Sequence, residues 1–123
     1  MEGIEYPSAE NAYQAAKTLD LTLRVPFETC TAFQAKRQSH KLALRSDWQE
    51  TKLGVMKQLL VQKFSDKDLL KKLEQTGKRL LIEGNTWHDN FWGDCSCDKR
   101  ASCKEKGENH LGKLLMMIRD KTD

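Results

Sequence analysis

Long apolar runs are missing from this sequence, and so are the marks of a targeting segment. No stretch approaches the roughly 20 apolar residues that a helix needs to span a bilayer, and nothing at the amino terminus resembles a secretory signal. Only two of the 123 residues are proline, and the chain contains no repeat, linker or low-complexity tract. We therefore expect a globular protein in the cytoplasm with no membrane partner.

Neither sign of charge dominates the sequence. Twenty-one basic residues stand against 18 acidic ones, which leaves a net charge of +3. This balance does not argue for nucleic-acid binding by charge alone, although it would not repel a phosphate group. At 123 residues the chain suits one domain, residues 1–123, large enough to bury a core without disulfides or metals.

Cysteine is limited to four residues, and three of them, Cys95, Cys97 and Cys103, crowd into one short segment. Such crowding is a poor disulfide framework, and a cytoplasmic protein keeps its thiols reduced. With His88 and His110 nearby, the cysteines could supply four soft ligands. Structural zinc sites usually show C-x₂-C pairs, however, and C-x-C-x₅-C departs from that spacing. We therefore predict no metal and no cofactor, and interpret the segment as a polar surface loop with exposed thiols.

The order of apolar patterns predicts a mainly α, α-rich α+β fold with a small strand component in a single compact domain. Alternation over residues 3–6 predicts a strand, after which Ser8 suits the N-cap of a helix of about three turns that reaches Leu19. Further helices are expected at residues 27–38, 47–64, 66–73 and from Asn109 onward. In the helix over 47–64, a stripe of apolar residues at spacings of three and four should face the core, namely Leu53, Val55, Met56, Leu59, Leu60 and Phe64.

Residues 81–94 form the most informative stretch for function. They combine two tryptophans, a histidine and several acids within one predicted loop. Aromatic walls with a few placed carboxylates are typical of a small-molecule pocket. The alternative is a half-buried turn in which Trp87 and Trp92 cover the edge of the core.

The first predicted helix carries a second set of polar residues. Glu10, Tyr13, Gln14 and Lys17 are spaced so that they share one helix face. An acid on this face, together with the acids Glu83, Asp89 and Asp94, suggests chemistry at an anomeric carbon. Two carboxylates in unequal environments are the minimum for hydrolysing such a bond. The alternative is a solvated stripe of ordinary surface charges.

Other residue types fit the same chemistry. Trp48 and Trp92 could stack on a base, and Lys17 and Arg45 could hold a phosphate. The run from Gly107 to Gly112 opens the last helix, where backbone N–H groups suit an anion. Its alternative interpretation is an N-cap by Asn109, with Gly112 allowing close packing.

Short motifs spread along the chain carry a family resemblance. They are Y-P-S-A-E-N-A-Y-Q-A-A-K at 6–17, R-S-D-W at 45–48, T-G at 76–77, L-I-E at 81–83, W-G at 92–93 and G-E-N-H-L-G at 107–112. In order and spacing, from Gly3 to Arg119, they resemble the NADAR family, also called YbiA-like. Relative to that family, we expect the sequence to lack an amino-terminal segment with an F-S-N-F motif.

The resemblance implies an N-glycosidase, which cleaves the bond between ribose phosphate or ADP-ribose and a base or amine. Its substrate would be a nucleotide-type small molecule, such as a riboflavin-pathway aminopyrimidine ribotide, or ADP-ribosylated guanine in nucleic acid. No metal is implied, because protonation can release the base. Carried over by position, the catalytic candidates are Glu10, Glu83 and Asp89. The substrate-binding candidates are Tyr13, Lys17, Arg45, Trp48, Trp92, Gly93 and Asn109.

Two other functions remain open from the sequence. A chain without the family's amino-terminal segment could bind ADP-ribose or NAD without cleaving it. The cysteine cluster could instead build a small zinc-dependent nucleic-acid-binding protein.

Overall fold

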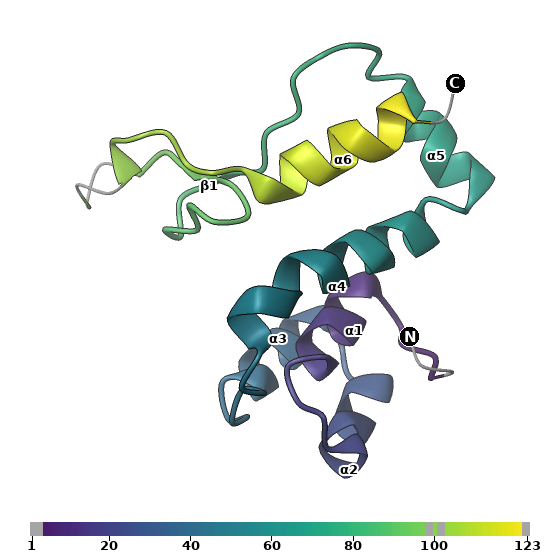
Figure 1. Cartoon of the computed structure of the whole chain (residues 1–123), viewed down its shortest axis with the longest axis vertical. Helices are drawn as coiled ribbons and strands as arrows, with labels where there is room; N and C mark the ends of the chain where they lie inside the picture. Colours follow the sequence, from purple (N-terminus) through teal and green to yellow (C-terminus); the bar gives the residue numbers. More distant parts are fainter. Residues whose placement is uncertain (1–3, 98–99, 101–102, 122–123) are drawn as a thin grey trace. The chain divides into compact units, whose positions relative to one another are not determined.

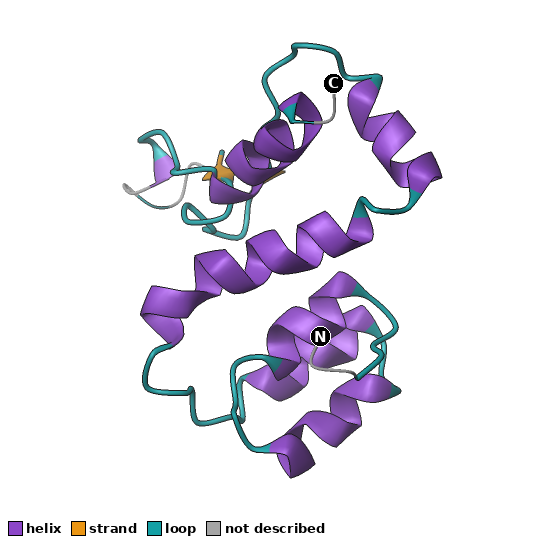
Figure 2. Cartoon of the chain, turned by 45° about the vertical axis from the view of Figure 1, so that its right-hand side comes forward, coloured by secondary structure: helices purple, strands orange, loops and turns teal. Residues whose placement is uncertain are grey.

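The computed structural model describes residues 4–97, 100 and 103–121 (Figure 1). Six α-helices, one 3₁₀ helix and one two-stranded sheet are found in this part of the chain. The helices dominate, as Figure 2 shows, which confirms the predicted α-rich class with a small strand component. Two compact units, Met1–Lys63 and Phe64–Asp123, divide the chain, and each is described by itself. The prediction of a single domain stays a prediction.

The amino-terminal unit is entirely helical where it is described. Its elements are α1 (Ala9–Ala15), α2 (Leu21–Arg24), η1 (Val25–Glu28), α3 (Ala32–Ser39) and α4 (Trp48–Lys63). Helix α1 packs against both α3 and α4. Ala15, Phe27 and Ala35 form the buried cluster between α1, η1 and α3. The small alanines let two helices approach closely around one aromatic ring.

A buried asparagine joins α1 to the segment after η1. Asn11 is fully buried, and its amide nitrogen donates to the carbonyl oxygens of Phe27 at 3.0 Å and Cys30 at 2.8 Å. Buried backbone carbonyls need such partners. Asn11 therefore provides a hydrogen-bond donor for the backbone carbonyls of both Phe27 and Cys30.

Two boundaries in this unit differ from the sequence prediction. The strand predicted at residues 3–6 is wrong for residues 4–6, while Gly3 lies outside the described residues. A strand needs a hydrogen-bonded neighbour, and the described part of this unit holds no second strand. Ser8 does cap α1 and accepts a hydrogen bond from the Asn11 amide at 3.1 Å. The helix ends at Ala15 rather than Leu19, because Asp20 caps a new helix, α2.

The predicted helix over 27–38 is also interrupted. Thr31 and Gln34 form a capping box that starts α3 at Ala32, since each side chain satisfies the other residue's backbone amide. The helix predicted at 47–64 is confirmed as α4. Met56, Leu59 and Leu60 of its apolar stripe are buried, whereas Leu53 is 37% exposed.

The carboxy-terminal unit packs two helices together beside a minimal sheet. It contains α5 (Lys67–Glu74), β1 (Gly84–Asn85), β2 (Asp94–Cys95) and α6 (His110–Asp120). Helix α5 confirms the helix predicted at 66–73, and Asp66 caps it. Gly77 adopts a positive φ of 65° just after that helix, a conformation that glycine tolerates. The strands pair in parallel, with Gly84 opposite Asp94 and Asn85 opposite Cys95.

A buried arginine ties α6 to the segment after α5. The guanidinium of Arg119 donates to Thr76 Oγ1 at 3.0 Å and to the carbonyl of Arg79 at 2.8 Å. Leu73, Leu114 and Ile118 are buried in the same unit. In the part of the chain that can be described, no helix is long and apolar enough to cross a membrane.

Candidate functional site

Asn85, a buried residue that the sequence analysis did not select, organises the loop between β1 and β2. Its Oδ1 accepts from the backbone amide of Asp89 at 3.1 Å. Its Nδ2 donates to the carbonyl of Asp89 at 2.8 Å and to Glu83 Oε2 at 3.1 Å. One side chain therefore contacts both catalytic candidates of this stretch, the Glu83 carboxylate and the Asp89 backbone. The spacing E-x-N-x₃-D is the signal that the sequence offered for it.

Asp89 closes the loop by accepting backbone hydrogen bonds. Its Oδ1 accepts from the amides of Phe91 at 3.2 Å and Trp92 at 2.9 Å, the pattern of a side chain that stabilises a turn. Among the described residues, none donates to its Oδ2 atom. This half-buried carboxylate thus has one oxygen engaged in folding and one oxygen open.

Glu83 is held in a similar way. Its Oε2 accepts from Asn85, its backbone amide donates to Asn109 Oδ1 at 2.9 Å, and Oε1 has no partner in the described part of the chain. Gly93 is needed here, because a Cβ atom at that position would overlap the Glu83 carboxylate and carbonyl oxygens. Gly93 therefore acts through close packing of the loop against Glu83.

Asn109 lies before α6 in a left-handed conformation, with φ of 54°. It occupies the N-cap position, as the alternative interpretation held, but its side chain makes no capping hydrogen bond. It donates instead to the carbonyl of Leu81 at 2.9 Å and accepts from Glu83, so both ends of its amide hold the strand-like segment at 81–83. Gly112 permits the same close approach, since a Cβ there would overlap the Leu81 carbonyl.

The start of α6 does not offer free amides to a phosphate. The backbone amides of residues 108–111 donate to the carbonyls of residues 90–93 at distances of 2.8–3.1 Å. The Gly107 amide donates to Asp94 Oδ1 at 2.9 Å. The anion-binding interpretation is therefore wrong for residues 107–111, because their amides already donate to the carbonyls of residues 90–93 and to Asp94.

The aromatic residues of the loop are unequally exposed. Trp92 is half-buried and packs edge-to-face on Phe91, with ring centroids 4.9 Å apart. Phe91 in turn lies against the ring of His110, while Trp87 is 58% exposed. A cavity of about 290 Å³ beside β2 is lined by Leu80, Ile82, Asp94, Asn109 and neighbouring residues. Neither Glu83 nor Asp89 lines this cavity.

In the amino-terminal unit, the polar face predicted for the first helix is confirmed for Glu10, Tyr13 and Gln14, whereas Lys17 lies beyond the end of α1 at Ala15. Gln14 donates to Glu10 Oε1 at 2.8 Å, and the Lys17 ammonium lies 5.5 Å from the centre of the Tyr13 ring. Tyr13 contacts Trp48 with ring centroids 5.2 Å apart. Burial lowers the pKa of Lys17, while the negative charge of Glu10 acts in the opposite direction.

Arg45 and Trp48 are both engaged within this unit. Arg45 binds the Asp47 carboxylate in bidentate fashion, at 2.6 and 2.9 Å, and this hydrogen bonding lowers the pKa of Asp47. The backbone of Arg45 also donates to the Lys17 carbonyl. Trp48 is only 4% exposed. Their predicted contacts with phosphate and base stay predictions.

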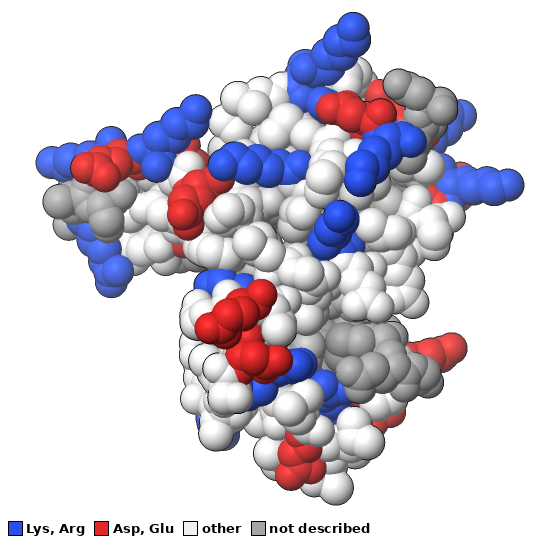
Figure 3. All heavy atoms as spheres, in the orientation of Figure 1, with Lys and Arg blue, Asp and Glu red and all other residues white. Residues whose placement is uncertain are grey.

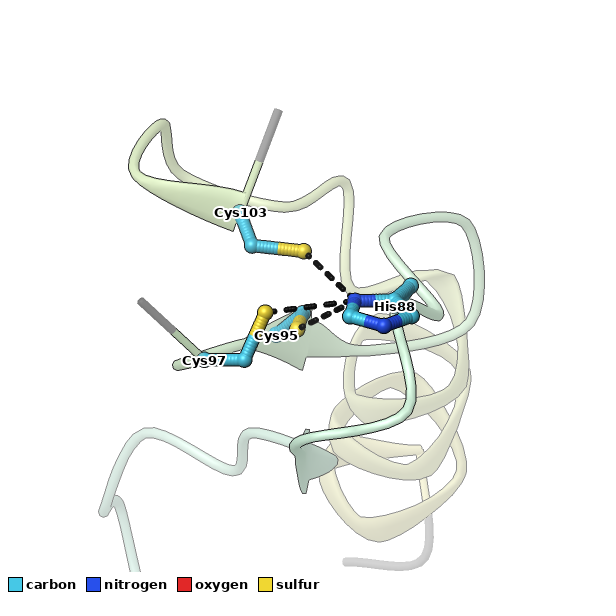
Figure 4. Close-up of side chains that lie close together, drawn as sticks. All are labelled: His88, Cys95, Cys97 and Cys103. Atoms are coloured by element: carbon cyan, nitrogen blue, oxygen red, sulfur yellow. Dashed lines mark hydrogen bonds between the residues drawn. The ribbon is translucent and has the colours of Figure 1, made fainter. Parts of the chain in front are cut away.

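The cysteine segment differs most from its prediction. Cys95 and Cys103 are buried, at 2% and 5% exposure, so the interpretation as exposed thiols is wrong for both. Figure 4 shows the sulfur atoms of Cys95, Cys97 and Cys103 gathered around one ring nitrogen of His88. A hydrogen bond with Cys95, burial and contact with Cys97 raise the pKa of Cys103 to about 11.

Charges of both signs are interspersed on the face shown in Figure 3, in keeping with the small net charge. The chain matches the NADAR domain over residues 1–122. It belongs to the NADAR family. The resemblance inferred from the motifs is thereby confirmed.

Similar proteins are named either as N-glycosidases or as riboflavin biosynthesis proteins. The N-glycosidase Npun_R5314 of Nostoc punctiforme is 40% identical over 63% of this chain and 45% of its own length. The riboflavin biosynthesis protein VVA0006 of Vibrio vulnificus is 31% identical over 98% of this chain. The chain spans only 32% of the Vibrio protein, so it corresponds to less than half of either relative.

A shorter relative matches more completely. The N-glycosidase YbiA of Shigella boydii is 32% identical over 98% of this chain and 72% of its own length. The NMR structure of YbiA from E. coli superposes with a TM-score of 0.81 at 30% identity, covering 98% of this chain and 70% of that one. These matches confirm the YbiA-like fold.

Proposed function

We propose that this NADAR protein is an N-glycosidase that hydrolyses the bond between C1′ of a ribose phosphate or ADP-ribose and a base or amine. Membership of the family and the N-glycosidase names of its relatives support this class of reaction. The observation that carries the proposal is the arrangement around Asn85. Its side chain fixes Glu83 and the Asp89 backbone, and an oxygen of each carboxylate remains open.

The reaction needs a group that tolerates positive charge on the sugar. As the bond from C1′ to nitrogen breaks, the electron pair leaves with the nitrogen, which takes up a proton, and water adds to C1′. A carboxylate stabilises the oxocarbenium-like transition state or removes a proton from the attacking water. We assign these roles to Glu83 and Asp89, and propose that Glu10 also serves as a catalytic acid or base.

The remaining candidates would bind the substrate. Trp92 offers a half-buried aromatic surface on which a base can stack, and Tyr13 and Trp48, whose rings contact each other, are proposed to take part in binding as well. Lys17 and Arg45 would meet phosphate oxygens. Lys17 suits this role because its ammonium is partly desolvated, which strengthens its attraction for an anion.

Two substrate classes fit this chemistry: aminopyrimidine ribotides of the kind made in riboflavin synthesis, and ADP-ribosylated guanine in nucleic acid. The test offers both to the purified chain side by side and follows the released base and sugar phosphate by chromatography. Release from either substrate supports the proposal and names the class. Binding of ADP-ribose or NAD by calorimetry, with no release from either substrate, would identify a non-catalytic binding module instead.

A further inference from the structure

Three sulfur atoms converge on a single nitrogen in the carboxy-terminal unit. The Nδ1 atom of His88 lies 3.2 Å from the sulfur of Cys97, 3.4 Å from that of Cys103 and 3.8 Å from that of Cys95. A ring nitrogen carries either one hydrogen or one lone pair. Hydrogen bonding therefore accounts for one of these contacts, but not for three at once.

The distances match a metal ion at the centre of the cluster. With bonds of about 2.3 Å to sulfur and about 2.05 Å to nitrogen, a tetrahedral zinc ion places each sulfur about 3.6 Å from the nitrogen. The observed separations of 3.2, 3.4 and 3.8 Å bracket this value. All four candidate ligand atoms lie within 4.8 Å of one another, as the vertices of one coordination shell must.

The surrounding backbone supports the same arrangement. His88 adopts a positive φ of 72°, a conformation that is uncommon outside glycine but that histidine adopts more readily than most residues. This conformation turns the ring toward the cysteines (Figure 4). Asn90 then holds two of the thiol-bearing residues. Its Oδ1 accepts from the Cys95 amide at 2.8 Å, and its Nδ2 donates to the Cys103 sulfur at 3.7 Å. Donors of this kind orient ligands and stabilise thiolates.

We propose that His88, Cys95, Cys97 and Cys103 bind one zinc ion in a structural site. Three sulfurs and one imidazole form a ligand set that binds zinc in preference to magnesium or calcium. Four protein ligands complete a tetrahedral shell, so the ion would not bind water or substrate. The thiols would bind as thiolates and release their protons to solvent. The ion would join the loop 86–93 to β2 and to Cys103.

The proposed zinc site takes no part in the proposed glycosidase reaction, so it can be present whether or not the protein has that activity. The linear spacing argued against it, because the ligands do not form C-x₂-C pairs and come from the loop 86–93, from β2 and from residues after it. Pairing of β1 with β2 brings the loop that carries His88 to Cys95. The turn at Cys103 supplies the fourth ligand.

The test measures metal in the full chain, purified under reducing conditions, by elemental analysis. We expect one zinc per chain, and a cobalt-reconstituted protein with the visible bands of tetrahedral cobalt and a sulfur-to-cobalt charge-transfer band. Cys97→Ser and His88→Gln should each lose most of the zinc. Cys30→Ser is the matched control, because Cys30 lies in the amino-terminal unit, and it should retain one zinc per chain.

Cys97 and His88 are only partly buried, so their variants test the site even where substitution of Cys95 or Cys103 prevents folding. Circular dichroism would establish that each variant is folded. Folded wild-type protein that takes up no stoichiometric zinc after incubation with zinc chloride and reductant would overturn the proposal. So would variants that bind zinc as tightly as the wild type, or a stoichiometric iron or copper content in place of zinc.

Discussion

The side-chain amide of Asn85 donates a 3.1 Å hydrogen bond to Glu83 Oε2 while it binds the backbone of Asp89 on both sides. Asn85 is 5% exposed, so water cannot replace these contacts. The position of both acids therefore depends on one buried amide. The loop 86–93 is thus tied by hydrogen bonds to the buried residue that contacts both proposed catalytic acids.

Asn85→Ala removes all of these hydrogen bonds at once. Leaving buried partners unsatisfied should lower the free energy of unfolding by about 1–3 kcal/mol. Hydrolysis should fall as well, because Glu83 and Asp89 lose their orientation. Urea unfolding and the turnover rate measure the two effects. The exposed Gln58→Ala on α4 is the control, and an Asn85→Ala protein that matches it in both measurements would refute the role of Asn85.

Gly93→Ala tests the close approach of the loop to Glu83. The new Cβ would overlap the Glu83 carbonyl, and backbone cannot move aside as a flexible side chain can. Overpacking of this kind costs about 1–3 kcal/mol of folding stability. Gly54→Ala provides the matched control, because nothing lies within 4 Å of a Cβ at that helical position. It should stabilise the protein by about 0.5–1 kcal/mol. Equal effects of the two substitutions on thermal unfolding would contradict this account.

Lys17 should make stability depend on pH in a defined direction. Burial lowers its pKa below the ordinary value of 10.5, so the unfolded chain binds more protons than the folded one between the lowered pKa and 10.5. The contribution of Lys17 to the free energy of unfolding therefore becomes more favourable as the pH rises through that window. Urea unfolding of the wild type and of Lys17→Met, each near neutral pH and near pH 10.5, measures how the difference in their free energies of unfolding changes with pH. A wild type that loses stability relative to the variant as the pH rises would be the opposite result.

The same variant separates binding from folding. Lys17→Met removes a desolvated charge, so its stability near neutral pH should equal or exceed that of the wild type. If Lys17 meets a phosphate, the variant's KM for a phosphorylated substrate should rise about tenfold, the equivalent of roughly 1.4 kcal/mol. Steady-state kinetics with that substrate provides the measurement. An unchanged KM would remove Lys17 from the substrate-binding residues.

Regular helices were predictable from the sequence because their signals are local. Helix α4 shows apolar residues at spacings of three and four, and Asp66 and Ser8 mark the starts of their helices. The strands β1 and β2 contain two residues each, too few for any alternation to show. The predicted strand at the amino terminus failed because alternation does not reveal whether a partner strand exists.

The parts of the candidate site that the sequence did not reveal depend on contacts between a side chain and distant backbone. Asn85 and Asn109 bind backbone carbonyls and amides four to 28 residues away, and such bonds follow no period. The zinc ligands likewise come together through strand pairing. Glu83 and Asp89 were selected from the sequence because carboxylates occur there close to two tryptophans, and their catalytic role stays a prediction.

Hydrolysis by the conservative variants Glu83→Gln and Asp89→Asn tests the central claim most directly. Each substitution keeps the size and most hydrogen bonds of the side chain but removes its charge. We predict that release of base and sugar phosphate falls by about 10²–10⁴-fold in each. Glu74→Gln, which alters an exposed acid on α5, should release product at the wild-type rate. Folded Glu83→Gln and Asp89→Asn proteins that both retain full activity would contradict the account.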